Sequence, residues 1–413
     1  DLHLSLRRQR QMCIRDSQED RAAAAARQGA RTVLLERDRY LGGVLEQCIH
    51  PGFGLHRYRE ELTGPEFAHR LRGELRESGA EVVTEVTVLE LDPRGPRVKA
   101  VSPQGLAVFR PRAVVWATGA RERPLGALRI PGARPAGIFT AGLAQRLVNI
   151  HGLLPGRRAV ILGSGDIGLI MARRLHLEGV EVAAVLEIKP FPGGLIRNVV
   201  QCLEDFGIPL LLRHTVAELH GRERLSGVTV VEVDEAGTPL PGTEEFLECD
   251  TLVLSVGLIP ENRLIEQFVP LDPVNRGPRV NSLLQTEAPW LFAAGNNLAV
   301  FDLVDSVAEL GARAGAAAAR YARGKPSEGR AIPLVRGENV LHLVPSALVP
   351  GERTTVYIRV PRPLPRARVS LGDVVSKNHL GVRPTEMIEI VLAGDELEEL
   401  VRQPQVRVEV TPA

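Results

Sequence analysis

The sequence has 413 residues with 51 basic and 50 acidic side chains, which give a formal net charge of +1. A chain of this length can form two or three domains, and its near-zero charge gives no reason to expect nucleic acid or an anionic membrane as a partner. No apolar run is long enough to cross a bilayer and no signal-peptide core is visible, so we expect a cytoplasmic protein. The four cysteines include no C-x-x-C pair, so neither a metal site nor a disulfide framework is expected.

The first 18 residues do not fit the pattern that follows them. Residues 29–36, GARTVLLE, repeat the pattern of residues 179–187, GVEVAAVLE. Counting back by the interval in the second copy puts a first strand and a glycine loop near residues 8–17, where this sequence has no glycine. A disordered basic tail and an Arg-rich transit peptide are two alternatives. We favour a third, a non-native segment over residues 1–18, because RRQRQMCIRDS resembles translated sequencing-adapter read-through.

Several candidate site residues follow the first repeat. Glu36 ends a strand, where an acid of a dinucleotide fold accepts hydrogen bonds from a ribose, and a glycine pair at Gly42 and Gly43 lets the chain pass close to a flavin. Cys48 is either a buried, inert thiol or a redox thiol beside the flavin, and a dithiol mechanism lacks its second cysteine. His50 is either a residue beside the flavin or a loop residue bonded to backbone.

The next motif is an apolar strand that ends in Ala117-Thr118-Gly119 and runs into RERP. The glycine lets the backbone lie against a cofactor, and the Arg/Pro tail indicates that the chain leaves its first domain there. A helix is expected over residues 66–78 before it. The Pro/Gly-rich residues 126–156 are expected to cross into a second domain.

Residues 159–187 carry the strongest motif of the chain. A short apolar strand is followed by Gly163, Gly165 and Gly168 at G-x-G-x-x-G spacing, then by an amphipathic helix and a second strand that ends in Glu187. The three glycines permit the tight turn, the approach of a pyrophosphate and the close packing of helix on strand. Glu187 can accept hydrogen bonds from a ribose 2′-OH and would repel a 2′-phosphate, which favours NAD over NADP. A helix is expected over residues 195–206.

The second domain closes as the first one does. Residues 251–257, TLVLSVG, are the counterpart of the Ala-Thr-Gly strand, and Gly257 either faces the nicotinamide or forms a plain turn. The chain then returns to the first domain through a strand that ends at Gly295. Asp302 and Asp305 start the next helix, and an interaction with its dipole is favoured over catalysis.

After residue 325 the pattern changes to short alternating strands between Pro/Gly turns, typical of a small β-sandwich-like domain. We therefore expect an α/β protein in which a dinucleotide-binding domain at residues 19–125 and 271–328 is interrupted by a second one at residues 126–270. A β-rich domain follows at residues 329–413. It has no catalytic constellation and is expected to dock onto a second copy or another subunit.

Together these motifs resemble the FAD-dependent pyridine-nucleotide oxidoreductase family with two Rossmann-like domains, over residues 19–323. Within it, LGG, QCIHPGFG and AGNN…FDLVD resemble the branch without a redox disulfide. That branch includes NAD-linked flavoprotein subunits found beside glycerol-3-phosphate dehydrogenases, and relatives in amine-oxidising and cyanide-forming complexes. The resemblance implies FAD and NAD, with hydride passing between nicotinamide and flavin and electrons passing to or from a partner.

In this family the residue after the last glycine holds the ribityl chain and is usually Asp, whereas here it is Asn296. The motifs and the resemblance together imply FAD-binding residues Glu36, Gly42, Gly43, Ala117, Thr118, Gly119, Gly295 and Asn296, and NAD-binding residues Gly163, Gly165, Asp166, Ile167, Gly168, Glu187 and Gly257. Cys48 is the one candidate catalytic residue. Two alternatives remain: an NADH oxidase or peroxidase that uses Cys48, and a non-catalytic subunit of a hetero-oligomeric dehydrogenase.

Overall fold

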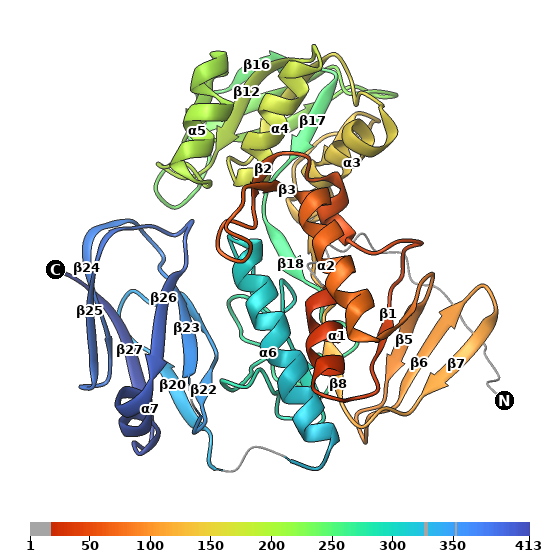
Figure 1. Cartoon of the computed structure of the whole chain (residues 1–413). Coiled ribbons are helices and arrows are strands. Elements are labelled where there is room, and N and C mark those ends of the chain that lie inside the picture. Colours follow the sequence, from red (N-terminus) through yellow and green to blue (C-terminus); the bar gives the residue numbers. More distant parts are fainter. Residues whose placement is uncertain (1–17, 326–328, 352) are drawn as a thin grey trace. The chain divides into compact units, whose positions relative to one another are not determined.

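The computed structural model describes residues 18–325, 329–351 and 353–413 (Figure 1). The segment assigned to a non-native N-terminus, with its missing glycine loop, lies outside the described residues except for Gln18. The chain divides into two compact units. One unit is Glu122–Leu258, and the other combines the chain up to Arg121 with Ile259–Ala413. The sequence had placed the corresponding inner domain at residues 126–270.

The inner unit, Glu122–Leu258, is built on a five-stranded parallel sheet of order β10-β17-β11-β12-β13. Its strands are β10 (Ile138–Thr140), β11 (Arg158–Leu162), β12 (Glu181–Glu187), β13 (Leu210–Leu212) and β17 (Thr251–Leu254). The helices are α3 (Ala141–His151), α4 (Asp166–Leu177) and α5 (Ile196–Cys202). A three-stranded antiparallel sheet contains β14 (His214–His220), β15 (Gly227–Glu232) and β16 (Glu245–Glu248).

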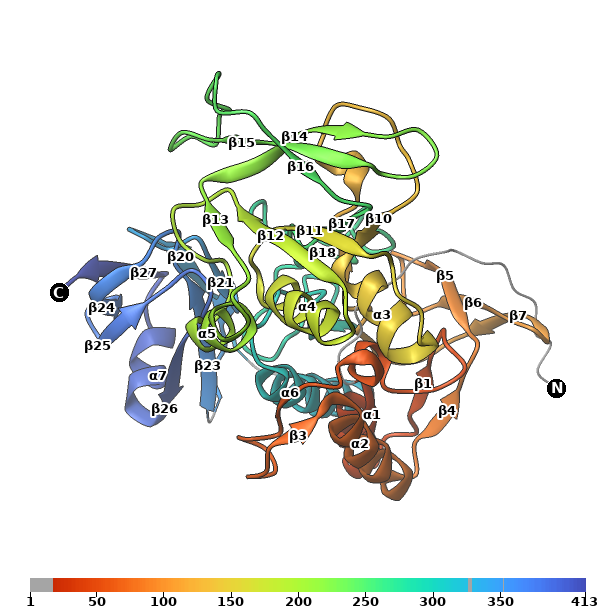
Figure 2. The same ribbon diagram turned by 90° about the horizontal axis from the view of Figure 1, so that it is seen from above.

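Side chains of β11 alternate between two apolar cores, which explains its unbroken apolar sequence. Ala159 and Ile161 pack among the side chains of α3 and α4, whereas Val160 and Leu162 pack with Val228 of the antiparallel sheet. The parallel sheet is therefore covered by helices on one face and by β14, β15 and β16 on the other (Figure 2).

The outer unit is the chain up to Arg121 together with Ile259–Ala413. Outside residues 329–413, its described parallel strands form two separate pairs, whereas those of the inner unit form one five-stranded sheet. The two pairs are β1 (Val33–Leu35) with β4 (Glu81–Val83), and β8 (Val114–Trp116) with β19 (Leu291–Ala293). Among the described residues, β1 and β8 each pair with one strand, whereas their counterparts β12 and β17 each pair with two. The helices are α1 (Gln18–Arg27), α2 (Gly64–Ser78) and α6 (Val304–Ala322), and an antiparallel meander contains β5 (Thr87–Leu91), β6 (Val98–Ser102) and β7 (Gly105–Phe109).

Glycines of α6 allow α1 to pack closely against it. A Cβ at Gly315 would lie 2.2 Å from the carbonyl oxygen of Arg21, and a Cβ at Gly311 would lie 3.0 Å from the Arg21 side chain. The first distance excludes a larger residue because backbone would have to move, and the second is a tight contact with a side chain. Helix α6 is therefore fitted to α1 by two small residues one turn apart.

Two expected helices differ from the structure at their ends. Helix α2 begins at Gly64, before the expected residue 66, because Thr63 and Glu66 form a reciprocal capping box. The helix expected over residues 195–206 ends at Cys202 and is followed by a 3₁₀ turn over Glu204–Phe206. The end of an element is the part that periodicity determines least.

The β-rich region after residue 328 forms two sheets around one core, with strand orders β22-β20-β27-β24-β25 and β21-β23-β26. The first sheet contains β20 (Ile332–Arg336), β22 (Ala347–Leu348), β24 (Leu364–Leu371), β25 (Val375–Val382) and β27 (Val406–Pro412). The second contains β21 (His342–Val344), β23 (Arg353–Arg359) and β26 (Ile388–Ala393), and α7 spans Gly394–Val401. The short strands predicted from sequence at residues 340–344, 354–360, 368–371, 387–392 and 406–410 overlap β21, β23, β24, β26 and β27, whereas β20, β22 and β25 were not predicted. Strand β25 is an edge strand and carries Ser376, Lys377 and Asn378.

Candidate dinucleotide-binding sites

The glycine loop of the inner unit joins β11 to α4, and the protein itself requires two of its glycines. Gly163 has a φ of 101°, and a Cβ there would lie 2.1 Å from the carbonyl oxygen of Ser255. A Cβ at Gly168 would lie 2.4 Å from the Gly163 carbonyl oxygen. These residues are glycines because the loop, α4 and the chain after β17 pack directly on one another.

Gly165 differs from the other two. Its φ is −64°, which any residue adopts, and the nearest atom to a Cβ would be Ser255 Oγ at 3.6 Å, an ordinary contact. No described residue therefore requires glycine at this position. The position lies at the N-terminus of α4, where free N–H groups favour a phosphate.

Hydrogen bonds hold the side chains of Glu187 and Asp166 near this loop. One carboxylate oxygen of Glu187 accepts from Ser164 N at 3.1 Å and from Ser164 Oγ at 2.5 Å, and the other accepts from Lys189 N at 3.1 Å. Asp166 accepts from Leu195 N at 2.8 Å and from Asn198 Nδ2 at 2.6 Å. The Asp166 side chain thus anchors the chain before α5.

Two other residues that the sequence had assigned to the NAD site lie in this unit. The side chain of Ile167 packs against the core on the helix side of the sheet. Gly257 has a φ of 93°, and its carbonyl oxygen accepts from Arg123 N at 3.1 Å. Nothing in the described chain lies within 4 Å of a Cβ at Gly257, so its glycine is required by backbone conformation alone.

The outer unit repeats the acid at the end of the second strand. Glu36 is 2% exposed and its Oε1 accepts from Asp38 N at 2.6 Å. Glu187 makes the same bond to the backbone N–H two residues further on. The similarity predicted from sequence between residues 29–36 and 179–187 therefore extends to the conformation of the turn that follows each acid.

The glycine pair after Glu36 opens a 3₁₀ turn over Gly43–Gln47, and both glycines have positive φ angles, 113° at Gly42 and 54° at Gly43. Cys48 ends this turn and is 8% exposed. Its carbonyl oxygen accepts from Gly64 N at 2.8 Å, so the start of α2 packs against it. His50 is half-buried, and its Nδ1 lies 3.0 Å from the Pro51 carbonyl oxygen.

The Ala117-Thr118-Gly119 turn is bonded to the segment that returns from the inner unit. Thr118 Oγ1 donates to the Glu261 carbonyl oxygen at 2.5 Å, and Glu261 N donates to the Gly119 carbonyl oxygen at 3.0 Å. Gly119 has a φ of 67°.

The turn at Gly295 is hydrogen-bonded to the strand that leads to Gly119 and to the segment that returns from the inner unit. Asn297 Nδ2 donates to the Trp116 carbonyl oxygen at 3.1 Å, and Asn262 Nδ2 donates to the Asn297 carbonyl oxygen at 2.7 Å. The turns at Gly119 and Gly295, which are far apart in sequence, therefore meet in the outer unit. Asn296 is 7% exposed, and its Oδ1 accepts from Phe301 N at 3.0 Å.

Two buried acceptors at this meeting point fit a bound flavin nucleotide. The amide oxygens of Asn262 and Asn297 are buried and accept no hydrogen bond within the described chain. A buried amide oxygen without a donor is costly, and the hydroxyl and N–H groups of a flavin nucleotide could supply one. Sequence reasoning named Gly295 and Asn296 but missed these two residues. The available signals were the Asn-Asn pair after Gly295 and the Pro-Glu-Asn that follows β18 (Leu258–Pro260).

The first turn of α1 carries three buried charged residues, Glu19, Asp20 and Arg21, each at most 3% exposed. Aligning Gly29 with Gly179 puts apolar residues, Leu169 to Met171, at the same place in α4. Arg21 lies against the Gly295 turn, since a Cβ at Gly295 would meet its guanidinium at 2.4 Å.

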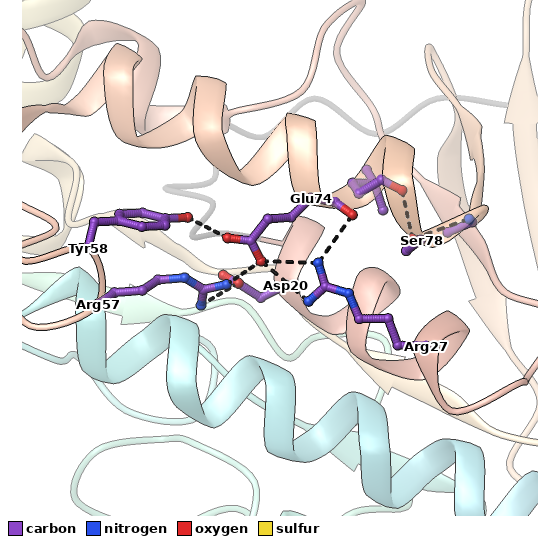
Figure 3. A network of polar contacts seen from close by, with 8 residues as sticks. Asp20, Arg27, Arg57, Tyr58, Glu74 and Ser78 are labelled. Atoms are coloured by element: carbon purple, nitrogen blue, oxygen red, sulfur yellow. Dashed lines mark hydrogen bonds and ion pairs between the residues drawn. The ribbon is translucent and has the colours of Figure 1, made fainter.

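A polar network surrounds Asp20 (Figure 3). Arg57 lies 2.6 Å from an Asp20 oxygen and 2.7 Å from Glu74, which also accepts from Tyr58 Oη at 2.7 Å. Burial raises the pKa of Asp20 to about 7, although the neighbouring Arg57 acts in the opposite direction. The pKa of Tyr58 is raised by burial and by its hydrogen bond to Glu74.

The two carboxylates at the start of α6 hold other segments rather than only the helix end. Asp305 accepts from Gly54 N at 3.2 Å and Arg57 N at 2.9 Å, which fixes the chain after Cys48. Asp302 accepts from Arg359 at 2.7 Å and from Met387 N at 2.8 Å, both in the β-rich region. Both carboxylates therefore do more than act as helix-start charges, although Asp305 does lie in the first turn of α6 as expected.

Other kinds of site are not found in the part of the chain that the structure describes. It contains no group of three His, Cys, Asp or Glu side chains that could hold a metal ion. The cysteines within it, Cys48, Cys202 and Cys249, are buried thiols. None of the described helices combines the length and apolar character needed to cross a membrane.

Comparisons with known proteins agree with this geometry. An opine oxidase subunit from Agrobacterium tumefaciens is 25% identical over 260 residues, which cover 59% of this chain and 50% of that protein. Thioredoxin reductase from Lactococcus lactis has a TM-score of 0.62 at 17% identity, over 78% of this chain and 100% of that one. A ferredoxin reductase from Rhodopseudomonas palustris has a TM-score of 0.54 at 18% identity, over 91% of this chain and 88% of that one.

The two structural likenesses show the fold: two Rossmann-like domains followed by a β-rich region. This chain spans about half the length of the first of these relatives. The family model described as pyridine nucleotide-disulphide oxidoreductase matches residues 20–318. This chain therefore belongs to the pyridine nucleotide-disulphide oxidoreductase family, whose members are flavin-dependent NAD(P) oxidoreductases.

Proposed function

We propose that this protein is an FAD-dependent NAD(H) oxidoreductase. The inner unit binds NAD through Gly163, Gly165, Gly168 and Glu187, and the outer unit binds FAD. When bound, the flavin exchanges a hydride with the nicotinamide and passes electrons to or from a second acceptor. The observation that carries the proposal is Gly165, which no contact within the described chain requires and which lies at the start of α4.

The outer unit would hold FAD with Glu36 at the ribose and with the turns at Gly43, Thr118, Gly119 and Gly295 against the cofactor. The unpartnered amide oxygens of Asn262 and Asn297 support this assignment. Arg21, which lies against Gly295, supports it through charge. These side chains bind and orient, and none of them has to move a proton during hydride transfer.

Glu187 favours NADH over NADPH, because its buried carboxylate would meet the 2′-phosphate of NADPH. The acceptor is not a disulfide of this chain, since Cys48 has no second cysteine a few residues away. We infer a partner dehydrogenase subunit, or a second copy of this chain, that docks through residues 329–413. The motif resemblance to the glycerol-3-phosphate dehydrogenase-linked subunits supports a subunit role, as does the name of the similar opine oxidase protein, which is itself a subunit.

The test is anaerobic titration of the FAD-loaded protein with NADH and, separately, NADPH, followed by flavin absorbance. Bleaching by NADH but not NADPH is the expected result. A second version, with a strand and a G-x-G-x-x-G loop placed ahead of Arg21, separates weak FAD retention from a lack of activity. If the flavin is bound in either version and NADH does not bleach it, the proposal is wrong and the protein is a non-catalytic subunit.

The Cys48→Ser variant distinguishes this proposal from the alternative of an NADH oxidase or peroxidase that uses Cys48. We expect bleaching by NADH to be unchanged, because Cys48 is buried at the end of a 3₁₀ turn. Peroxide-dependent NADH oxidation that is present in the parent and lost in this variant would instead support an oxidase or peroxidase. The Cys202→Ser variant, at another buried cysteine, is the control.

A further inference from the structure

A cavity of about 670 Å³ lies in the outer unit, between α6 and the start of the β-rich region. Its walls include Arg313, Arg320 and Tyr321 of α6, Arg353 and Thr354 of β23, and Gln285. This volume is within the range of sites for small molecules. None of these residues belongs to the glycine turns assigned to FAD or NAD.

The charge of the cavity wall is unbalanced. Arg313, Arg320, Arg353 and Lys325 line it, and among the lining residues that the structure describes Glu309 is the one acidic side chain. Within the described chain, none of these four cations forms an ion pair. Four cations that form no ion pair with any described residue give this cavity wall a positive potential that attracts an anion.

Arg313 is the innermost of these cations. Its Nη2 donates to the Ser282 carbonyl oxygen at 3.1 Å and to Thr354 Oγ1 at 2.9 Å, which orients the guanidinium from both α6 and β23. Burial lowers the pKa of Arg313 from its usual high value, yet the group stays charged at neutral pH. A half-buried guanidinium held by two neutral acceptors has donors left for an anion.

The positions of the arginines suit a ligand with more than one charged group. Arg313 and Arg320 are seven residues apart on α6 and therefore lie on the same side of the helix, with Ala316 and Ala317 between them in the cavity wall. Arg353 approaches from the other wall at the start of β23. Cations on both walls suit an anion with more than one charged group.

We propose that this cavity binds a small, multiply charged anion carrying phosphate or carboxylate groups, which bridges Arg313 and Arg320 of α6 to Arg353 of β23. The ligand is additional to FAD and NAD. Its binding would connect the β-rich region to α6, whose first turn holds the chain after Cys48 through Asp305.

The experiment uses the full chain saturated with FAD and NAD, so that the dinucleotide sites are filled. Inorganic pyrophosphate and citrate are titrated separately by isothermal calorimetry, and the stronger of the two identifies phosphate or carboxylate as the preferred group. We expect saturable one-site binding that weakens as salt is raised. Arg320→Glu and Arg353→Glu, both at exposed positions, should each weaken it at least tenfold.

The matched control is Arg366→Glu, which makes the same charge change at an exposed position of β24 outside the cavity wall. It should bind the probe as the parent does. The proposal is overturned if neither probe binds, or if Arg366→Glu weakens binding as much as the cavity variants. It is also overturned if the cavity variants bind like the parent.

Discussion

The two dinucleotide-binding units share one plan but differ at their first strand and first helix turn. In the inner unit β11 lies between β12 and β17, and the residues of α4 that align with the start of α1, Leu169 to Met171, are apolar and pack into the core. In the outer unit the described chain has β1 and β8 in separate pairs, and α1 begins with Glu19, Asp20 and Arg21, all buried. The comparison shows that the acid at the end of the second strand accepts the same backbone hydrogen bond in both units, although the helix before it starts with different residues.

The largest effect is expected where the inner unit is packed most tightly. Gly168→Ala puts a Cβ 2.4 Å from the Gly163 carbonyl oxygen and 2.8 Å from Ser255. Because backbone must move to relieve this, we expect a loss of at least about 3 kcal/mol in the free energy of unfolding. Denaturant unfolding measures it. Gly79→Ala is a poor control because its φ is positive, so Gly73→Ala, which meets no atom within 4 Å, serves instead. Equal stability of the Gly168 and Gly73 variants would contradict the account.

The second prediction concerns the buried acid of α1. The pKa of Asp20 is about 7 in the folded chain against an ordinary value of 3.8. Between these values the unfolded chain has lost the proton that the folded chain keeps, so stability falls as pH rises from about 4 to about 7. Asp20→Asn should remove this slope and be more stable than the parent at pH 8, by up to about 4 kcal/mol.

Unfolding curves at several pH values in this interval test the Asp20 prediction. Asp373→Asn, at an exposed turn, is the control and should keep the parental slope. If the free energy of unfolding of Asp20→Asn changes with pH as it does in the parent, the raised pKa of Asp20 is contradicted.

The third prediction tests whether the β-rich region holds the start of α6. Arg359 and Asp302 are 13% and 17% exposed, and Arg359 also donates to the Val300 carbonyl oxygen at 3.0 Å. Arg359→Met should leave Asp302 with one fewer donor in a partly buried place and cost about 3 kcal/mol. Arg402→Met, whose ion pair with Glu398 is exposed, should cost less than about 1 kcal/mol. A similar loss in both variants would refute a specific role for the Arg359 contact.

The smallest effect is on cofactor choice. Glu187→Gln removes the negative charge at the end of β12, and we expect the ratio of NADPH to NADH affinity to rise about tenfold, which corresponds to about 1.4 kcal/mol. Fluorescence titration with each nucleotide measures the ratio. Glu181→Gln, at the exposed start of the same strand, should leave it unchanged. An unchanged ratio in Glu187→Gln would mean that this carboxylate serves only to hold Ser164 and Lys189.

The sequence was sufficient for features with a fixed spacing. The glycine loop, Glu187, Glu36 and the two closing turns all come from local patterns, and the family match over residues 20–318 confirms the fold that they indicated. What reading the sequence missed depends on contacts between distant segments. Asn262 and Asn297 become notable only because Asn262 donates to the Asn297 carbonyl oxygen, and the role of Asp302 depends on an arginine 57 residues away.

The charged start of α1 is another feature that depends on contacts between distant segments. Charged side chains at the start of a helix are usually exposed, but here Glu19, Asp20 and Arg21 are buried, and Arg21 packs on Gly311 and Gly315 of α6. No local pattern in residues 18–27 indicates this burial.

The most direct test of the central claim is NADH binding to the Gly165→Ala variant of the full chain, measured together with its melting temperature. No described atom lies closer than 3.6 Å to the added Cβ, so the melting temperature should change little. If a pyrophosphate occupies that space, the affinity for NADH should fall at least tenfold. Parental affinity for NADH in a variant with a parental melting temperature would contradict the claim that α4 begins a dinucleotide site.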